Sequence, residues 1–305
     1  MRWGQVGSRS INEVAIREDH EMKPISRGPR YSSWHSVLLF YLAAYAFPFP
    51  FGFLPFGLHL YNRLSSECAT VLEWYFHLAT SWANPSGFAG RDVTSAMLGV
   101  LVTMLFAIMG AAIARRLNGI LRLKLERILS GYISLYLGAT LIAYGAFKIL
   151  PAQFPVPDQA RLSGTYAASS LTQLLWMFMG SSKLYAGFGG ALEFLAGALL
   201  MLGYASAGSF LASIVLVNVA VIDLSYHVPA FLLSLHLLGT AVFLIRSEIR
   251  QIVEILLRSD SPTGTQMVRL TKVGPHPKPG ALRIATLVAF AGIQFWLAYA
   301  QIHHL

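Results

Sequence analysis

The chain has 305 residues, of which 55% are apolar and 12% are charged, about half the charged fraction of a typical soluble domain. The apolar residues occur in long blocks, several of them near the roughly 20 residues that a membrane-spanning helix needs. This composition excludes an ordinary soluble enzyme and predicts an all-α, multi-pass helical membrane protein. The single cysteine, Cys68, excludes an internal disulfide and any metal site built from several thiolates.

The first third of the chain is expected to contain a tail and two spans. Residues 1–33 are polar and mixed in charge, which is typical of a cytoplasmic tail rather than a cleaved signal peptide. Residues 34–114 contain two apolar blocks, at about 34–58 and 94–114, joined by an outer loop. Three prolines in the first block predict irregular backbone in its outer half, because a proline removes a helical hydrogen bond.

The middle of the chain predicts an amphipathic segment and then four spans. Residues 115–128 place apolar and basic side chains on different faces of a helix. This pattern fits either a cytoplasmic surface helix on anionic headgroups or a simple topology signal. A short apolar piece at 171–179 is too brief to cross and is expected to lie in the interface. The four spans within residues 129–246 are expected at about 129–150, 184–203, 208–223 and 228–245.

The last part of the chain predicts a seventh span. Residues 247–281 combine a helical apolar stripe with a Ser-, Thr-, Pro- and Gly-rich stretch, and predict a cytoplasmic helix followed by a flexible linker. Residues 282–305 contain the final apolar block. The loops between the fourth, fifth and sixth spans are very short, so these helices are expected to pack antiparallel as neighbours.

The distribution of basic residues predicts the orientation. Eighteen of the 23 Lys and Arg residues lie in the N-terminal tail, in residues 115–128 and in residues 246–283, whereas the alternate segments hold four. Because Lys and Arg accumulate in cytoplasmic loops, the N-terminus is expected in the cytoplasm and the C-terminus outside. The net charge of +9 thus marks topology, and no nucleic-acid partner is expected.

Polar residues inside the spans are the candidates for function, because an ionisable side chain near the bilayer centre costs about 2.5 to 3.5 kcal/mol. They all fall in the outer half of four consecutive spans, and this shared depth predicts one polar ligand-binding site. The candidate residues are Tyr144, Lys148, Glu193, Asn218, Asp223 and His236.

Glu193 is expected to face another helix, because it lies between Gly189 and Gly197 and small residues at this spacing mark helix contacts in lipid. A buried carboxylate needs a partner, and Lys148 and His236 are the two candidates. One interpretation is an ion pair that only fixes the helix register. The other is a cavity, open to the outside, that binds or protonates a small polar headgroup. Taken alone, His236 is also compatible with a hydrogen-bonded core histidine.

Other motifs are weak or missing. Glu73 and His77 have the spacing of two metal ligands on a helix, but two such residues often occur by chance, and no metal site is predicted. The sequence contains no nucleophile elbow, HExxH motif or P-loop. The chain is therefore not expected to be an enzyme by itself.

Three segments of the chain resemble the DoxX-like family of integral membrane proteins. They are YGAFKILPAQF at 144–154, LLWMFMGSSKLYAGFGGALEFLAGALLML at 174–202 and SYHVPAFLLSLHLL at 225–238. The resemblance implies a four-helix transmembrane bundle within residues 129–246, with two extra spans before it and one after it. It also matches Lys148 and Glu193 to a lysine and a glutamate of the family. The chain departs from the family at His227, where relatives often carry an acidic residue.

The resemblance implies a role near quinone-coupled or redox-stress chemistry in a bacterial cytoplasmic membrane. The leading hypothesis is a non-catalytic subunit that binds quinone or a lipid-like ligand beside a redox partner, with quinone as the candidate cofactor. One alternative is a small-molecule or proton-coupled transporter, in which Glu193 and His236 would be the titrating pair. Another alternative is a membrane scaffold or assembly protein.

Overall fold

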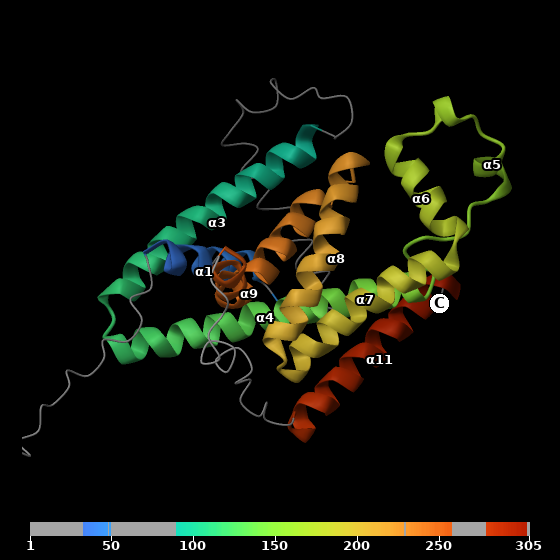
Figure 1. Cartoon of the computed structure of the whole chain (residues 1–305). Coiled ribbons are helices and arrows are strands. Elements are labelled where there is room, and N and C mark those ends of the chain that lie inside the picture. Colours follow the sequence, from blue (N-terminus) through green and yellow to red (C-terminus); the bar gives the residue numbers. More distant parts are fainter. Residues whose placement is uncertain (1–32, 48, 50–89, 229, 258–278, 304–305) are drawn as a thin grey trace, which may run out of the picture.

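The computed structural model describes residues 33–47, 49, 90–228, 230–257 and 279–303, and every regular element in these ranges is helical (Figure 1). The predicted tail, most of the outer loop with Glu73 and His77, and most of the linker before the last span lie outside the described residues. The elements are α1 (Ser33–Ala46), α3 (Gly90–Arg116), α4 (Gly119–Ile149), α5 (Gln159–Leu162), the 3-10 helix η2 (Tyr166–Ala168), α6 (Leu171–Ser181), α7 (Lys183–Leu202), α8 (Ala205–Ser225), α9 (Phe231–Leu257) and α11 (Ala281–His303).

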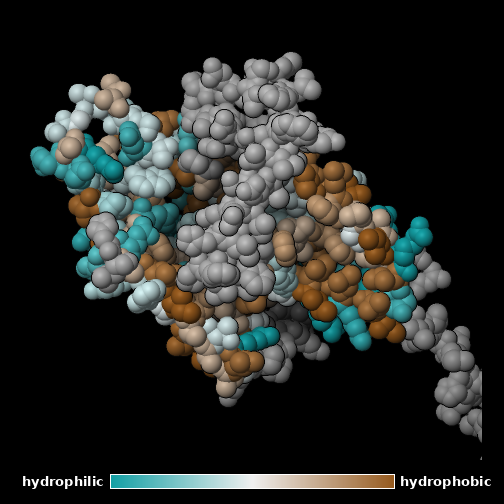
Figure 2. Space-filling model, turned by 180° about the vertical axis from the view of Figure 1, so that it is seen from behind, coloured by the Kyte–Doolittle hydropathy of each residue, from teal (hydrophilic) through white to brown (hydrophobic). Residues whose placement is uncertain are grey.

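Six of these helices, α3, α4, α7, α8, α9 and α11, are long and apolar enough to cross a membrane. The helix α1 is apolar but has only 14 residues and ends at Ala46, just before Pro48. The predicted first span is thus helical over its first half, and its second half lies outside the described residues. In Figure 2, hydrophilic side chains gather around α5 and α6 and at the end where α3 meets α4, and apolar side chains gather next to both regions.

The predicted amphipathic segment at 115–128 is not a separate surface helix. The helix α3 ends at Arg116, and Asn118 caps α4 by accepting a hydrogen bond from the backbone N–H of Leu121 (2.8 Å). From Gly119 the helix continues without a break to Ile149, because no proline interrupts it. In the same way, α9 runs on from its apolar part through Leu257, so the predicted cytoplasmic helix after the sixth span is the end of α9.

The predicted short hairpins join antiparallel helices. Gly203, with φ +95°, ends α7 in the left-handed conformation and lets α8 begin at Ala205. The short apolar piece forms α6, which has 11 residues and is too short to cross. Its Thr172 hydroxyl donates hydrogen bonds to the carbonyls of Tyr226 and His227, which holds α6 against the turn between α8 and α9.

Glycines bring α4 and α7 into close contact. A Cβ atom on Gly145 would lie 2.6 Å from the carbonyl oxygen of Gly190, and one on Gly197 would lie 2.5 Å from that of Gly138. These four positions form a glycine seam on which the two backbones touch. The expectation that Gly189 belongs to this contact is wrong, because an added Cβ there meets no heavy atom within 4 Å.

Two hydrophobic cores adjoin along α4 and α9. The first is made by α4, α7, α8 and α9, with Leu141, Leu200 and Leu216 among its buried side chains. The second packs α1 and α3 against α4 and α9, through residues such as Leu39 and Ile133. The helix α11 lies along α4 and α7 (Figure 1). The bundle therefore consists of a four-helix core with α1 and α3 added on one side and α11 on another.

Candidate functional site

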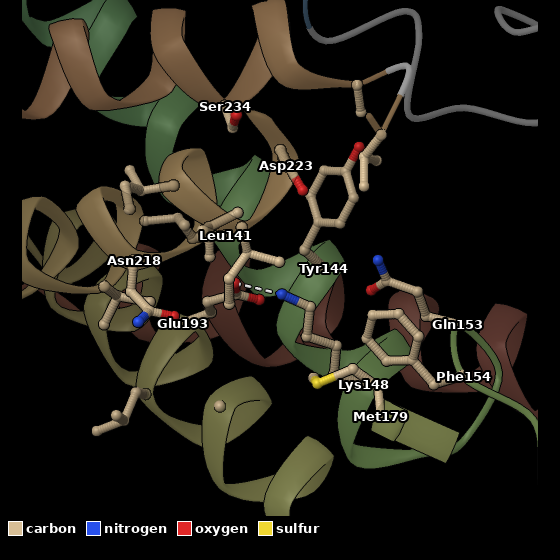
Figure 3. A pocket seen from close by; sticks show the side chains of 18 of the residues that line it. Leu141, Tyr144, Lys148, Gln153, Phe154, Met179, Glu193, Asn218, Asp223 and Ser234 are labelled. Atoms are coloured by element: carbon tan, nitrogen blue, oxygen red, sulfur yellow. Dashed lines mark hydrogen bonds and ion pairs between the residues drawn. The ribbon is translucent and has the colours of Figure 1, made fainter. Parts of the chain in front are cut away.

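A cavity of about 520 Å³ lies inside the four-helix core, at the end where α4 finishes and α7 begins. We call this end of the bundle the Lys148 end. The walls come from α4 and the residues that follow it, from α6, α7 and α8, and from the start of α9. Figure 3 shows the polar side chains that the cavity gathers. Its polar lining residues are Tyr144, Lys148, Gln153, Tyr185, Glu193, Asn218, Asp223 and Ser234.

The centre of the site is an ion pair between Lys148 and Glu193, whose side chains point toward one another in Figure 3. The Lys148 Nζ atom lies 2.5 Å from Glu193 Oε1, and the two side chains are only 10% and 3% exposed. The glycine seam places them. Lys148 follows Gly145 by one turn, Glu193 follows Gly190 by one turn, and the Lys148 Cβ would lie 2.7 Å from a Cβ on Gly190. Of the two partners predicted for Glu193, the structure selects Lys148.

The remaining predicted site residues divide into two groups. Tyr144 lies one turn before Lys148 on α4 and lines the same cavity. Asn218 and Asp223 both come from α8, and Asp223 is half-buried near the end of that helix. The structure therefore brings five of the six predicted residues to one cavity.

The sixth residue, His236, lies on another face of α9 and packs against α1. Its Nδ1 donates to the carbonyl oxygen of Leu232 (2.6 Å), which leaves Nε2 to accept from the Tyr41 hydroxyl (2.5 Å). The Tyr45 ring stacks on the imidazole with a centroid separation of 3.7 Å. Successive residues of a helix are rotated by about 100°, so the side chains of Ser234 and His236 lie about 160° apart around α9. Ser234 lines the cavity, and His236 therefore faces nearly the opposite way. His236 is thus a hydrogen-bonded histidine of the contact with α1.

The cavity has a largely apolar wall that reaches the surface of the bundle between α7 and α8. Phe188 on α7 and Ile214 on α8 both line the cavity, and they are 61% and 56% exposed. Deeper in, Leu141, Phe154 and Trp176 contribute apolar and aromatic surface. The cavity therefore borders the exposed apolar surface of two helices that are long enough to span a membrane.

The sequence analysis missed several contributors to the site, among them Gln153, Phe154, Trp176, Tyr185 and Ser234. Gln153 and Phe154 follow α4, and Trp176 lies on α6. Gln153 lies just after a predicted span, so it is not among the polar residues inside the spans. One signal was available: Gln153 and Phe154 belong to the run YGAFKILPAQF, which also contains Lys148.

The cavity is lined by more acidic than basic side chains. Among the described residues that line it, Lys148 carries the positive charge, whereas Glu193 and Asp223 are both acidic. The site therefore offers a hydrogen-bonding and ionic end together with an apolar wall. In the part of the chain that the structure describes, no group of three or more His, Cys, Asp or Glu side chains is arranged to hold a metal ion.

The fold and the site together define a multi-pass α-helical membrane protein with an amphiphilic cavity inside its helix bundle. Comparisons with protein-family models, with curated proteins and with solved structures give no match for this chain.

Proposed function

We propose that the protein is a non-catalytic membrane subunit that binds a quinone-like or other lipid-like amphiphile. The headgroup would lie at the Lys148–Glu193 pair and the chain along the apolar wall toward the exposed Phe188 and Ile214 of α7 and α8. One observation carries this proposal: a buried ion pair forms part of the wall of a largely apolar cavity, and exposed apolar residues of α7 and α8 line the same cavity.

The size and lining of the cavity support a small-molecule site. Its volume of about 520 Å³ lies within the roughly 300 to 1,000 Å³ that is usual for such sites. Pockets of this kind combine apolar walls with a few polar groups that orient the ligand, and they often occur between the helices of a bundle. A pair that only fixed the helix register would need no adjacent space, because close packing around it would serve the same purpose.

The sequence supports the cellular setting of the proposal. The DoxX-like resemblance favours a bacterial cytoplasmic membrane and a redox partner, and the Lys and Arg distribution favours a cavity in the outer half of that membrane. The transporter alternative relied on Glu193 and His236 as a titrating pair. The geometry lends it no support, because Glu193 bonds to Lys148 and His236 bonds to Tyr41.

Two glycines of α7 provide a direct test of the proposal. Gly189 lines the cavity and Gly187 does not, yet an added Cβ meets no heavy atom within 4 Å at either position. We expect Gly189→Leu to fill the cavity and weaken binding of decylbenzoquinone, its hydroquinone or monodecanoylglycerol by at least about tenfold. Gly187→Leu is the matched control and should bind like the native chain.

Binding would be measured by titrating each probe into purified protein in nanodiscs and by the accompanying shift in melting temperature. The proposal is wrong if none of the probes binds the native chain. It is equally wrong if Gly189→Leu and Gly187→Leu bind the probes alike.

A further inference from the structure

The carboxylate of Glu193 has one oxygen that is bonded and one that is not. Oε1 accepts from Lys148 Nζ, whereas Oε2 is buried and, among the described residues, finds no hydrogen-bond partner. The whole residue is 2% exposed, so bulk solvent does not reach this oxygen. A buried acceptor without a donor is costly, and in native proteins such an atom calls for a specific explanation.

Lys148, the other member of the pair, has unused hydrogen-bond donors. An ammonium group carries three N–H donors. Within the described part of the chain, Lys148 Nζ has one assigned hydrogen bond, the one to Glu193 Oε1. The pair therefore has an unused acceptor, buried next to the cavity, and unused donors on the adjacent ammonium group.

We infer that the ligand of this cavity carries a neutral hydroxyl headgroup that donates to Glu193 Oε2 and accepts from Lys148 Nζ. This inference rests on the proposed function, since it specifies the ligand of the same site. A hydroxyl is the simplest group that donates and accepts at one atom. The terminal torsion of a glutamate side chain is soft, so a small rotation suffices to turn Oε2 toward the cavity.

Other headgroups satisfy only part of this arrangement. A quinone carbonyl or an ether accepts from Lys148 but gives nothing to Glu193. A carboxylate or phosphate also only accepts, and it adds negative charge to a site whose described lining already has two acids and one base. An ammonium donates to Glu193 but meets the Lys148 charge and must itself be desolvated.

Two kinds of membrane molecule carry such a hydroxyl, namely a hydroquinone and an acylglycerol. Each can be paired with a probe that keeps the size and chain but lacks the donor. Decylhydroquinone is compared with decylbenzoquinone, and monodecanoylglycerol with propyl decanoate. Decanoate and decylamine test the anionic and cationic headgroups.

The experiment measures dissociation constants of these six probes for the full chain in nanodiscs, with a reductant added for the hydroquinone and omitted for the quinone. In at least one pair, the hydroxyl probe should bind about tenfold or more tightly than its donor-free partner, as expected for one hydrogen bond to a charged group. The pair that shows the difference identifies the source of the hydroxyl. Decanoate and decylamine should bind more weakly than either hydroxyl probe.

Variants of Glu193 test whether its carboxylate causes the preference for the hydroxyl probes. Glu193→Gln replaces an acceptor oxygen by an amide N–H₂, so in the pair that shows the difference, the preference for the hydroxyl probe should fall from about tenfold to near unity. Glu126→Gln makes the same change in a buried, paired glutamate at the opposite end of α4 and should leave the preference intact. If Glu193→Gln does not fold, the probe ratios of the native chain still decide the question.

The inference is overturned if the donor-free probes bind as tightly as their hydroxyl partners, or if decanoate or decylamine binds best, while Gly189→Leu still blocks binding. In that result the proposed function stands and only the identity of the headgroup is wrong. If none of the six probes binds the native chain, the proposed function fails together with the inference.

Discussion

Among the described residues, two buried ionic clusters lie at opposite ends of α4, and they are built differently. At one end, Arg122 and Glu126 pair within the helix at 3.0 Å, and Ser36 of α1 joins both of them. At the Lys148 end, Lys148 and Glu193 pair between two helices, and one carboxylate oxygen has no assigned partner. The first cluster is a closed network that connects α1 to α4. The second lies beside a cavity and has hydrogen-bonding capacity left over.

The contrast shows why a buried ion pair does not by itself indicate function. Both clusters contain a glutamate that is almost fully buried, since Glu126 is 6% and Glu193 is 2% exposed. The two clusters differ in the space around them and in how completely their hydrogen bonds are satisfied. A fully hydrogen-bonded network stabilises the structure. Hydrogen-bonding groups that are left unsatisfied beside a cavity are available to a ligand. Mutations at the two ends test this distinction.

The largest effect is expected for Lys148→Met, which leaves the Glu193 carboxylate buried without its counter-charge. Breaking a buried pair from one side costs about 3 to 5 kcal/mol in the free energy of unfolding. Arg122→Met should cost less, about 1 to 2 kcal/mol, because Ser36 still donates to Glu126 and the Arg122 side chain is 28% exposed. Equilibrium unfolding in mixed micelles measures both values.

The double variant Lys148→Met with Glu193→Gln serves as the control. It removes both charges, so it should recover most of the stability lost by Lys148→Met alone. The description of the Lys148–Glu193 pair as a desolvated ion pair is contradicted if Lys148→Met destabilises the protein no more than Arg122→Met does.

A smaller effect is expected for Gly145→Ala, which disturbs the glycine seam that positions the Lys148–Glu193 pair. The new methyl group would lie 2.6 Å from the Gly190 carbonyl oxygen and 2.7 Å from the backbone nitrogen of Phe194. Backbone atoms cannot move aside cheaply, so α4 and α7 must separate, at a cost of about 1 to 3 kcal/mol in unfolding free energy.

Gly131→Ala is the matched control on the same helix, because an added Cβ there meets no heavy atom within 4 Å. Alanine is the better helix former, so this variant should be neutral or more stable by up to about 1 kcal/mol. Equal melting temperatures for the two variants would mean that the seam does not hold the helices together.

Much of this arrangement could be predicted from the sequence. The apolar blocks predicted the six long apolar helices among the described residues, and Lys148 was one of the two partners predicted for Glu193. The rotation of a helix about its own axis was harder to predict when polar residues lie on more than one face. On α9, Ser234 lines the cavity and His236 contacts α1, and only the packing of α1 decides between these faces. The same ambiguity explains why the sequence indicated Gly189 rather than Gly190 as the contact glycine.

The smallest difference that we predict concerns two buried serines, one near each cluster. The Ser36 hydroxyl donates to Glu126 Oε1 (3.2 Å) and accepts from Arg122 Nη2 (2.9 Å), whereas the Ser234 hydroxyl donates to the Phe231 carbonyl of its own helix (2.9 Å). Ser36→Ala should cost about 1 kcal/mol in unfolding free energy, because it removes two hydrogen bonds between α1 and α4 while the Arg122–Glu126 pair persists.

Ser234→Ala should cost about 0.5 kcal/mol, because the Phe231 carbonyl keeps its backbone partners and the Asp223 carboxylate, with which Ser234 also interacts, is only half-buried. Thermal unfolding of both variants beside the native chain in one detergent gives the comparison. A larger loss for Ser234→Ala than for Ser36→Ala would contradict the distinction between the two ends. It would show that the cavity wall depends on its own polar groups for stability, as a closed network does.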